Sequence, residues 1–149
     1  MADRAAPLAR TVLQQCVHAR LQVCPPGQDE QEEQWVQIGP GMVIYVCFFK
    51  GATEDMLPQM VSSLLNQRLC EKPSGGLGSV LEVGGSVLLV PQATLGGRAK
   101  GRVMQYHGNI AKEEGRRLYQ CLVSLCRAQV EGAAAEVEVA AGDGAQGRR

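Results

Sequence analysis

Hydrophobic and polar positions divide the first part of the chain into strands. Residues 11–24 are rich in β-branched and partly alternating side chains and end at a Pro-Pro-Gly sequence, which predicts a first strand. Residues 35–38 and 42–49 predict a second strand region, with Gly39-Pro40-Gly41 as a bend between its halves. Because residues 42–49 are continuously apolar, we expect this strand to be buried on both faces.

Two later segments have the spacing of amphipathic helices. Apolar residues recur at helical intervals from Met56 to Leu69, and Thr53 precedes them as a candidate N-cap. Pro58 comes early enough in this helix to be tolerated. Residues 112–130 predict a second helix with one apolar stripe.

The segment between the two helices has the pattern of a β-hairpin. Residues 79–83 and 86–90 flank Gly84-Gly85, and both central residues of a type I′ turn need a positive φ angle. A short edge strand is expected at 136–140, followed by a loose tail from Gly142. Together these elements predict a single mixed α/β domain.

Composition and charge narrow the class of protein. The chain has 149 residues, 45% hydrophobic and 20% charged, which fits one globular domain. Its 15 basic and 15 acidic residues give no net charge, so bulk charge supplies no general attraction to nucleic acid. No apolar run is long enough to cross a membrane, and the amino-terminal residues do not resemble a secretory signal. We therefore expect a soluble intracellular protein.

Cysteine and histidine residues give no sign of a metal site. The six cysteines form no CxxC pair and no Cys/His cluster, and most lie among apolar residues, as small core residues do in a reducing compartment. They are Cys16, Cys24, Cys47, Cys70, Cys121 and Cys126. His18 falls inside the first predicted strand and is expected to be structural, whereas His107 lies in a polar loop from which it can reach a phosphate.

The segment from Pro91 to Gly97 is the strongest candidate for a catalytic loop. The chain has no GxSxG, P-loop or HExxH motif. This segment follows a buried strand, and its small residues allow a ligand to approach the backbone. Gln92 and Thr94 can orient a substrate, and backbone N–H groups freed by the turn can stabilise an oxyanion. An ordinary strand-end loop is the alternative.

Basic residues follow this loop closely. Residues 98–117 contain six basic and two acidic side chains in a neutral protein. Arg98, Lys100 and Arg102 come first, and Lys100 and Arg102 have the same-face spacing of an extended chain. Such clusters bind phosphate groups of nucleic acids, and a solvated charged face is the alternative.

Several segments of the chain resemble D-aminoacyl-tRNA deacylases. PQATLGG resembles the SQxTL active-site motif of that family, LQQCVHARLQV its first strand, and WVQIGPGMVIYVCFFKGA its second. The Pro-Gln-Ala variant, with LGGRAKGR and MQYHGN, is closest to the animal branch. The resemblance covers residues 8–130, which we expect to form the deacylase-like domain, with residues 131–149 as a divergent tail rich in Ala and Gly.

The resemblance implies a homodimer with a three-layer β/β/α fold in the cytoplasm. The implied reaction is hydrolysis of the ester between tRNA and a D-amino acid, glycine or L-alanine, with no metal or cofactor. A catalytically impaired tRNA-binding relative is the alternative, and a structural partner that keeps only the fold is a third. The site residues it implies have three roles: Gln92, Ala93 and Thr94 in catalysis; Gln15, Pro91 and Leu95 in substrate binding; and Arg98, Lys100, Arg102 and His107 in tRNA binding.

Two departures from the wider family refine these expectations. Gln15 stands where the wider family has an arginine, and Ala93 replaces a larger aromatic residue, so we expect a roomier pocket. Thr94 has no base beside it in the sequence, which favours a positioning role over covalent attack.

The carboxyl-terminal segment departs more strongly. The family has a second signature of NxGPxT type that crosses the dimer, and nothing after Glu131 matches it. We therefore expect a chain that is less stable and less active than relatives with this signature.

Overall fold

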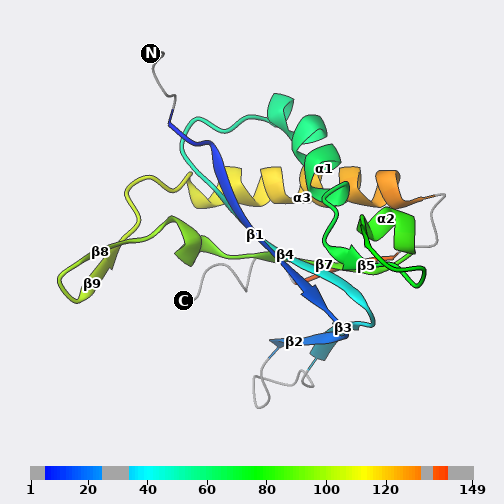
Figure 1. Ribbon diagram of the computed structural model, residues 1–149. Helices are drawn as coiled ribbons and strands as arrows, with labels where there is room; N and C mark the ends of the chain where they lie inside the picture. Colours follow the sequence, from blue (N-terminus) through cyan, green and yellow to red (C-terminus); the bar gives the residue numbers. More distant parts are fainter. Residues whose placement is uncertain (1–5, 25–33, 132–135, 141–149) are drawn as a thin grey trace.

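A four-stranded mixed sheet forms the centre of the molecule (Figure 1). The structure is a computed structural model that describes residues 6–24, 34–131 and 136–140. The strand order is β1 (Ala9–Cys16), β4 (Gly41–Phe48), β7 (Ser86–Pro91) and β10 (Val137–Val139). β1 pairs antiparallel with β4, whereas β4, β7 and β10 run parallel to one another. β10 is the edge strand expected at 136–140.

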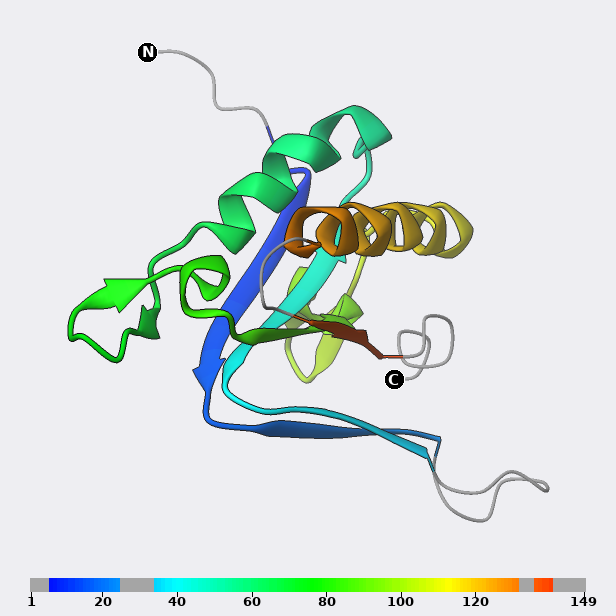
Figure 2. The ribbon, with the colours of Figure 1, turned by 90° about the vertical axis from the view of Figure 1, so that its right-hand side faces the viewer.

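Helices cover one face of this sheet (Figure 2). They are η1 (Glu54–Met56), α1 (Leu57–Leu65), α2 (Val80–Val83) and α3 (Lys112–Val130). Met42, Ile44 and Val46 of β4 point into the same apolar core as Leu118 and Leu122 of α3. The helix predicted at 112–130 is confirmed, because its apolar stripe packs on the sheet as the pattern requires.

A two-stranded sheet covers part of the opposite face. It consists of β2 (Ala19–Cys24) and β3 (Gln34–Ile38), and it packs Ile38 against Val43, Leu88 and Val90. Both faces of β4 are therefore buried, as its continuous apolar run predicted. The result is the mixed α/β domain with β/β/α layers that the sequence led us to expect.

Short hairpins complete the fold. β5 (Cys70–Glu71) pairs with β6 (Leu77–Gly78), and β8 (Arg98–Lys100) pairs with β9 (Val103–Gln105). A single 3-10 turn, η2 (Ala93–Gly96), joins β7 to β8. Among the described residues, no helix has the length and apolar character that a membrane crossing requires.

The first predicted strand is wrong as a single element. The chain leaves the central sheet after Cys16 and enters the second layer at Ala19, so Val17 and His18 form the corner between β1 and β2. His18 is exposed at this corner rather than placed within a strand. Alternation alone does not show where a strand changes sheets.

The hairpin predicted around Gly84-Gly85 is also wrong. Residues 80–83 form the helix α2, and Ser79 and Glu82 make a reciprocal capping box at its start. Gly84 has a φ angle of 71° and ends this helix, which is the other common use of a glycine with positive φ. β7 pairs with β4 on one side and with β10 on the other, so neither of its edges is left for a strand at residues 79–83.

Smaller differences concern element ends. The helix expected from Met56 starts as a 3-10 turn and ends at Leu65, and Thr53 occupies its N-cap position without a side-chain hydrogen bond. Arg102 lies in the turn between β8 and β9, so it does not share a strand face with Lys100. The predicted tail from Gly142 lies outside the described residues.

Candidate active site

The candidate catalytic loop is the single turn η2 at the carboxyl end of β7. The Gln92 N–H donates to the Val46 carbonyl at 2.8 Å and fixes the loop to the neighbouring strand β4. The Leu95 N–H donates to Gln92 and the Gly97 N–H to Thr94, which closes the turn. The N–H groups of Ala93 and Thr94 begin it and have no acceptor within the described residues. They are therefore two open donors at the end of a buried strand.

Gln92 and Thr94 form one polar unit on this turn. The Gln92 Nε2 donates to the Thr94 hydroxyl oxygen at 2.7 Å. The Thr94 O–H is thereby free to donate to another oxygen. An amide cannot take up the proton of an attacking hydroxyl, so this pairing supports positioning by Thr94 rather than nucleophilic attack.

Two residues from distant parts of the sequence hold the turn in place. Arg10 Nη1 donates to the Leu95 carbonyl at 2.9 Å, and the Arg10 guanidinium lies 5.4 Å from the centre of the Phe49 ring. On the other side, Asn109 Nδ2 donates to the Ala93 carbonyl at 3.0 Å. Both carbonyls are therefore engaged by side chains from outside the turn, which hold it in place.

Gly96 is required by this packing. A Cβ atom at Gly96 would lie 1.9 Å from Asn109 Oδ1 and 2.9 Å from Phe49 Cε1. Neither distance is compatible with a side chain, so the Asn109 contact depends on the glycine.

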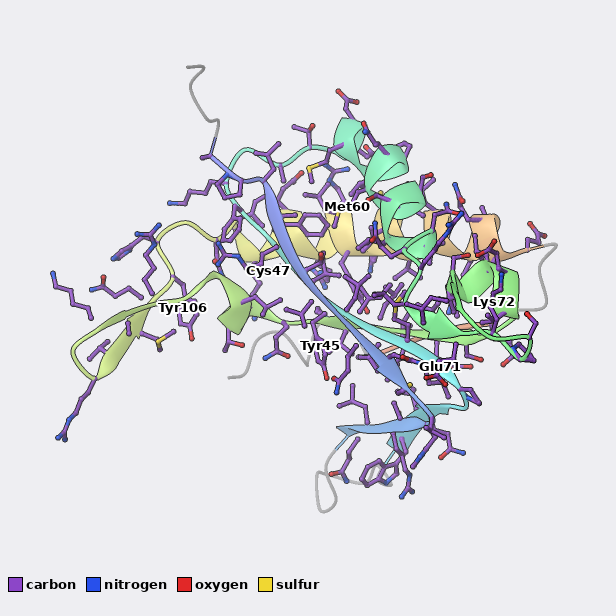
Figure 3. The ribbon with its side chains drawn as sticks, viewed as in Figure 1. Tyr45, Cys47, Met60, Glu71, Lys72 and Tyr106 are labelled. Atoms are coloured by element: carbon purple, nitrogen blue, oxygen red, sulfur yellow. The ribbon has the colours of Figure 1, made fainter. Side chains whose placement is uncertain are left out.

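A cavity of about 270 Å³ opens beside the turn. Strand β4, the loop and the start of α3 enclose it, and Figure 3 shows Cys47 and Tyr106 on this side of the molecule. Burial raises the pKa of the Cys47 thiol, so this thiol stays protonated and is a poor nucleophile. The lining residues are Val46, Cys47, Phe48, Pro91, Gln92, Ala93, Tyr106, Asn109, Ile110, Ala111, Lys112, Gly115 and Tyr119.

Tyr119 lines the cavity, but its role is mainly structural. Its hydroxyl donates to the Leu89 carbonyl at 2.9 Å, which ties α3 to β7. Burial raises the pKa of this phenol well above its ordinary value, so it does not supply a base at neutral pH.

The structure brings most of the predicted site residues together, with one exception. Pro91, Gln92 and Ala93 line the cavity, and Thr94 and Leu95 belong to the same turn. Gln15 pairs with Met42, four residues along β4 from the Val46–Pro91 pair, so it lies about 13 Å away along the sheet. A single chain therefore does not place Gln15 beside the loop.

The predicted tRNA-binding residues are all exposed beyond this loop. Arg98 and Lys100 lie on β8, Arg102 in the turn and His107 after β9. Within the described residues, no group of three or more His, Cys, Asp or Glu side chains is placed to hold a metal ion.

Sequence reasoning missed Arg10 and Asn109 as site residues. Asn109 ends MQYHGN, one of the segments on which the resemblance rests, and its proximity to a catalytic loop could have been suspected. Arg10 gives no such signal, because a lone arginine at the start of a strand is ordinarily a solvated residue.

Comparison with protein families gives a consistent match. The model of a family described as D-Tyr-tRNA(Tyr) deacylase matches residues 12–144. A zebrafish (Danio rerio) protein named D-aminoacyl-tRNA deacylase 2 is 64% identical over 122 residues, which are 82% of this chain and 76% of that protein. A human protein of the same name is 51% identical over 145 residues, which are 96% of this chain and 86% of the human protein.

Solved structures agree with the fold. A structure described as a probable eukaryotic D-amino acid tRNA deacylase is 26% identical, with a TM-score of 0.69 over 83% of this chain and 69% of that one. A c-Myc DNA unwinding element binding protein has a TM-score of 0.71 at 22% identity over 86% of this chain and 83% of its own, which is a likeness of fold alone.

Proposed function

Because the chain belongs to the D-Tyr-tRNA(Tyr) deacylase family, we propose that it hydrolyses the ester between an amino acid and the 3′ end of tRNA, as a proofreading step of translation. The substrates are D-aminoacyl-tRNA, glycyl-tRNA and L-alanyl-tRNA. One observation supports this function most directly. The open N–H groups of Ala93 and Thr94 begin a turn beside the cavity, and the Gln92–Thr94 pair lies on the same turn.

The chemistry suits a site with no activated nucleophile. An aminoacyl ester is already reactive, so orientation of the ester and stabilisation of the oxyanion supply much of the rate enhancement. In this mechanism, the Ala93 and Thr94 N–H groups receive the developing negative charge, and the Thr94 hydroxyl orients the ester or the attacking water. The 2′-hydroxyl of the terminal adenosine assists the attack. Pro91 and Leu95 shape the wall that faces the amino acid. Gln15 lies too far along β1 to reach this wall within one chain, so its proposed role in substrate binding belongs to the homodimer.

The basic residues after the loop complete the substrate site. Arg98, Lys100, Arg102 and His107 contact tRNA phosphates in this proposal, and their exposure next to the loop supports it. Replacing the first three with alanine should weaken tRNA binding and reduce the dependence of log affinity on log salt by roughly 0.7–0.9 per lost phosphate contact. An unchanged slope would leave them as a solvated face.

The proposal includes a homodimer located in the cytoplasm. β1 is an edge of the central sheet among the described strands, and Val12, Val17 and Trp35 are exposed. Unpaired edges and exposed apolar side chains favour pairing with a second copy. Sedimentation equilibrium tests this assembly. The free cysteines of the described part suit the reducing environment of the cytoplasm.

A deacylation assay separates the deacylase from the catalytically impaired tRNA-binding relative. D-Tyr-tRNA and threonine tRNA charged with L-alanine are incubated with the protein, and released amino acid is measured in single turnover. Hydrolysis supports the deacylase. Binding of either RNA without turnover supports the catalytically impaired relative instead.

A further inference from the structure

The β8–β9 hairpin has two chemically different faces. Its register pairs Ala99 with Met104 and Lys100 with Val103, and side chains alternate between the faces of a strand. Arg98, Lys100, Val103 and Gln105 therefore share one face, and Ala99, Met104 and Tyr106 share the other. Gly97 confirms the second grouping, since a Cβ atom there would lie 2.5 Å from Met104 Cε and 2.8 Å from Tyr106 Cε1.

The second face is apolar, exposed and continuous with the cavity. Met104 is 46% and Tyr106 is 39% exposed. Tyr106 also lines the cavity beside η2, and Figure 1 shows the hairpin extending outward from that turn. A surface formed by Tyr106 and Met104, here called the Tyr-Met platform, thus leads from the candidate active site along the hairpin.

The charged residues of the hairpin segment have one sign. No acidic residue occurs between Glu82 and Glu113, whereas Arg98, Lys100 and Arg102 lie within the hairpin. A partner that places negative charge beside an apolar, planar group matches both faces. Single-stranded RNA has this character, because its phosphates bind cations and its bases stack on aromatic and apolar side chains.

We propose that the Tyr-Met platform stacks the unpaired nucleotides of the tRNA 3′ end, next to the terminal adenosine. The inference rests on the proposed function and adds a recognition element for the single-stranded RNA that leads into the cavity. Gly97 matters because its lack of a side chain lets Met104 and Tyr106 approach the backbone closely. The basic face holds the phosphates, and the platform holds the bases.

Binding of uncharged tRNA to the full chain tests the platform without requiring catalysis. Fluorescence anisotropy is measured with three RNAs: intact tRNA, tRNA without its terminal adenosine, and tRNA without its unpaired 3′ nucleotides. Met104→Ala and Tyr106→Ala should weaken binding of intact tRNA by about fivefold or more. Met104→Ala should have the same effect when only the terminal adenosine is missing, and no effect when all unpaired nucleotides are removed.

Matched variants isolate stacking from folding and from charge. Val103→Ala lies on the opposite face at 62% exposure and should leave all three affinities unchanged. Tyr106→Phe keeps the ring and should retain the affinity lost in Tyr106→Ala. Lys100→Ala should reduce the salt slope, whereas Met104→Ala should not. Circular dichroism shows whether each variant is folded. If Tyr106→Ala does not fold, Met104→Ala and Tyr106→Phe still test whether the platform binds RNA.

Two results would overturn the platform. The first is an unchanged affinity of Met104→Ala and Tyr106→Ala for intact tRNA, and the second is an equal loss with the fully trimmed RNA. Failure of the proposed function looks different, because the wild-type chain would then release no amino acid from any aminoacyl-tRNA while the binding pattern of the three RNAs persisted.

Discussion

The two ends of β7 carry two short helical turns that differ in how their backbone is satisfied. Before the strand, α2 is closed by its own residues: the Ser79 N–H donates to Glu82 Oε1 at 2.8 Å, and the Glu82 N–H donates to Ser79 Oγ at 3.1 Å. After the strand, η2 has Gln92 at its N-cap position and no side-chain cap. Its first N–H groups are open, and Arg10 and Asn109 fix its carbonyls from outside.

We expect this difference to separate a structural turn from the candidate catalytic one. A capping box satisfies orphan donors locally and so favours folding. A turn that keeps N–H donors free for a substrate must be fixed by other groups. Otherwise its backbone would rearrange so that these N–H groups find acceptors within the protein. Ser79 is 2% exposed and Thr94 is exposed, which follows the same division.

The largest effect is expected at Gly96. Gly96→Ala places a Cβ atom within 1.9 Å of Asn109 Oδ1, so the turn or Asn109 must move. A displacement of about 1 Å in a catalytic group can cost roughly 100-fold in rate, and we expect a loss of that order in single-turnover deacylation. Gly39→Ala is the control, because a Cβ there meets nothing within 4 Å. Equal rates for both variants would contradict the role of Gly96.

The Gln92–Thr94 pair should give the next largest effect. Thr94→Ala removes the hydroxyl that orients the ester or water, and we expect a rate loss of at least about tenfold. Gln92→Ala should act in the same direction, because the 2.7 Å hydrogen bond to Thr94 is lost. Thr53→Ala is the matched control, since its side chain makes no capping bond. A normal rate in a folded Thr94→Ala variant would refute this role.

Arg10 should have a smaller effect that acts through the turn. Arg10→Ala removes the donor to the Leu95 carbonyl and should lower kcat by about three- to tenfold, the range of one ordinary hydrogen bond, because this one is exposed to solvent. Arg10→Lys keeps the charge and should recover part of the rate. A change confined to KM would mean that Arg10 contacts substrate instead of positioning the loop.

At the other end of β7, removal of the cap should affect stability and not catalysis. Ser79→Ala deletes the acceptor for the Glu82 N–H and should cost about 1 kcal/mol in the free energy of unfolding. Urea denaturation measures this change. The rate of deacylation by the folded fraction should be unchanged, and a large rate loss would show that the two turns are coupled.

The smallest effect is a pH dependence at the same cap. The hydrogen bond from the Ser79 backbone N–H lowers the pKa of the Glu82 carboxyl below its ordinary value of 4.5. A lowered folded-state pKa gives stability that is present above the unfolded value and lost as pH falls through the folded value. Wild type should therefore lose more unfolding free energy than Glu82→Gln between pH 6 and pH 3, by urea titration. Parallel pH curves for the two proteins would contradict this linkage.

The sequence predicts elements best where one periodicity extends over a long segment. α3 matches its predicted range because its apolar stripe persists over 19 residues. The burial of β4 on both faces follows from its unbroken apolar run. The sequence predicts a strand where α2 forms, because four residues are too few to show a period. The capping-box residues Ser79 and Glu82 are the local signal for a helix there.

The candidate site divides in the same way. Pro91 to Leu95 are contiguous, so a motif can indicate them together. Arg10 and Asn109 reach the loop only through tertiary contacts, and no local pattern contains that information. Resemblance has its own limit, which Gln15 shows. It is indicated as a site residue by its match to the family, but within one chain it lies away from the loop.

The Arg10–Leu95 hydrogen bond joins residues 85 positions apart, and Arg10 lies on β1, an edge of the central sheet as far as the described strands go. Edge strands open at lower free energy than the centre of a sheet. In a chain without its proposed partner copy, each local opening of β1 should therefore release the candidate catalytic turn while the core of β4, β7 and α3 stays folded. During synthesis the turn is likewise completed late, after residue 109 has left the ribosome. Mild denaturant should abolish activity before it unfolds the domain. We therefore expect activity to be lost at a lower denaturant concentration than the folded structure.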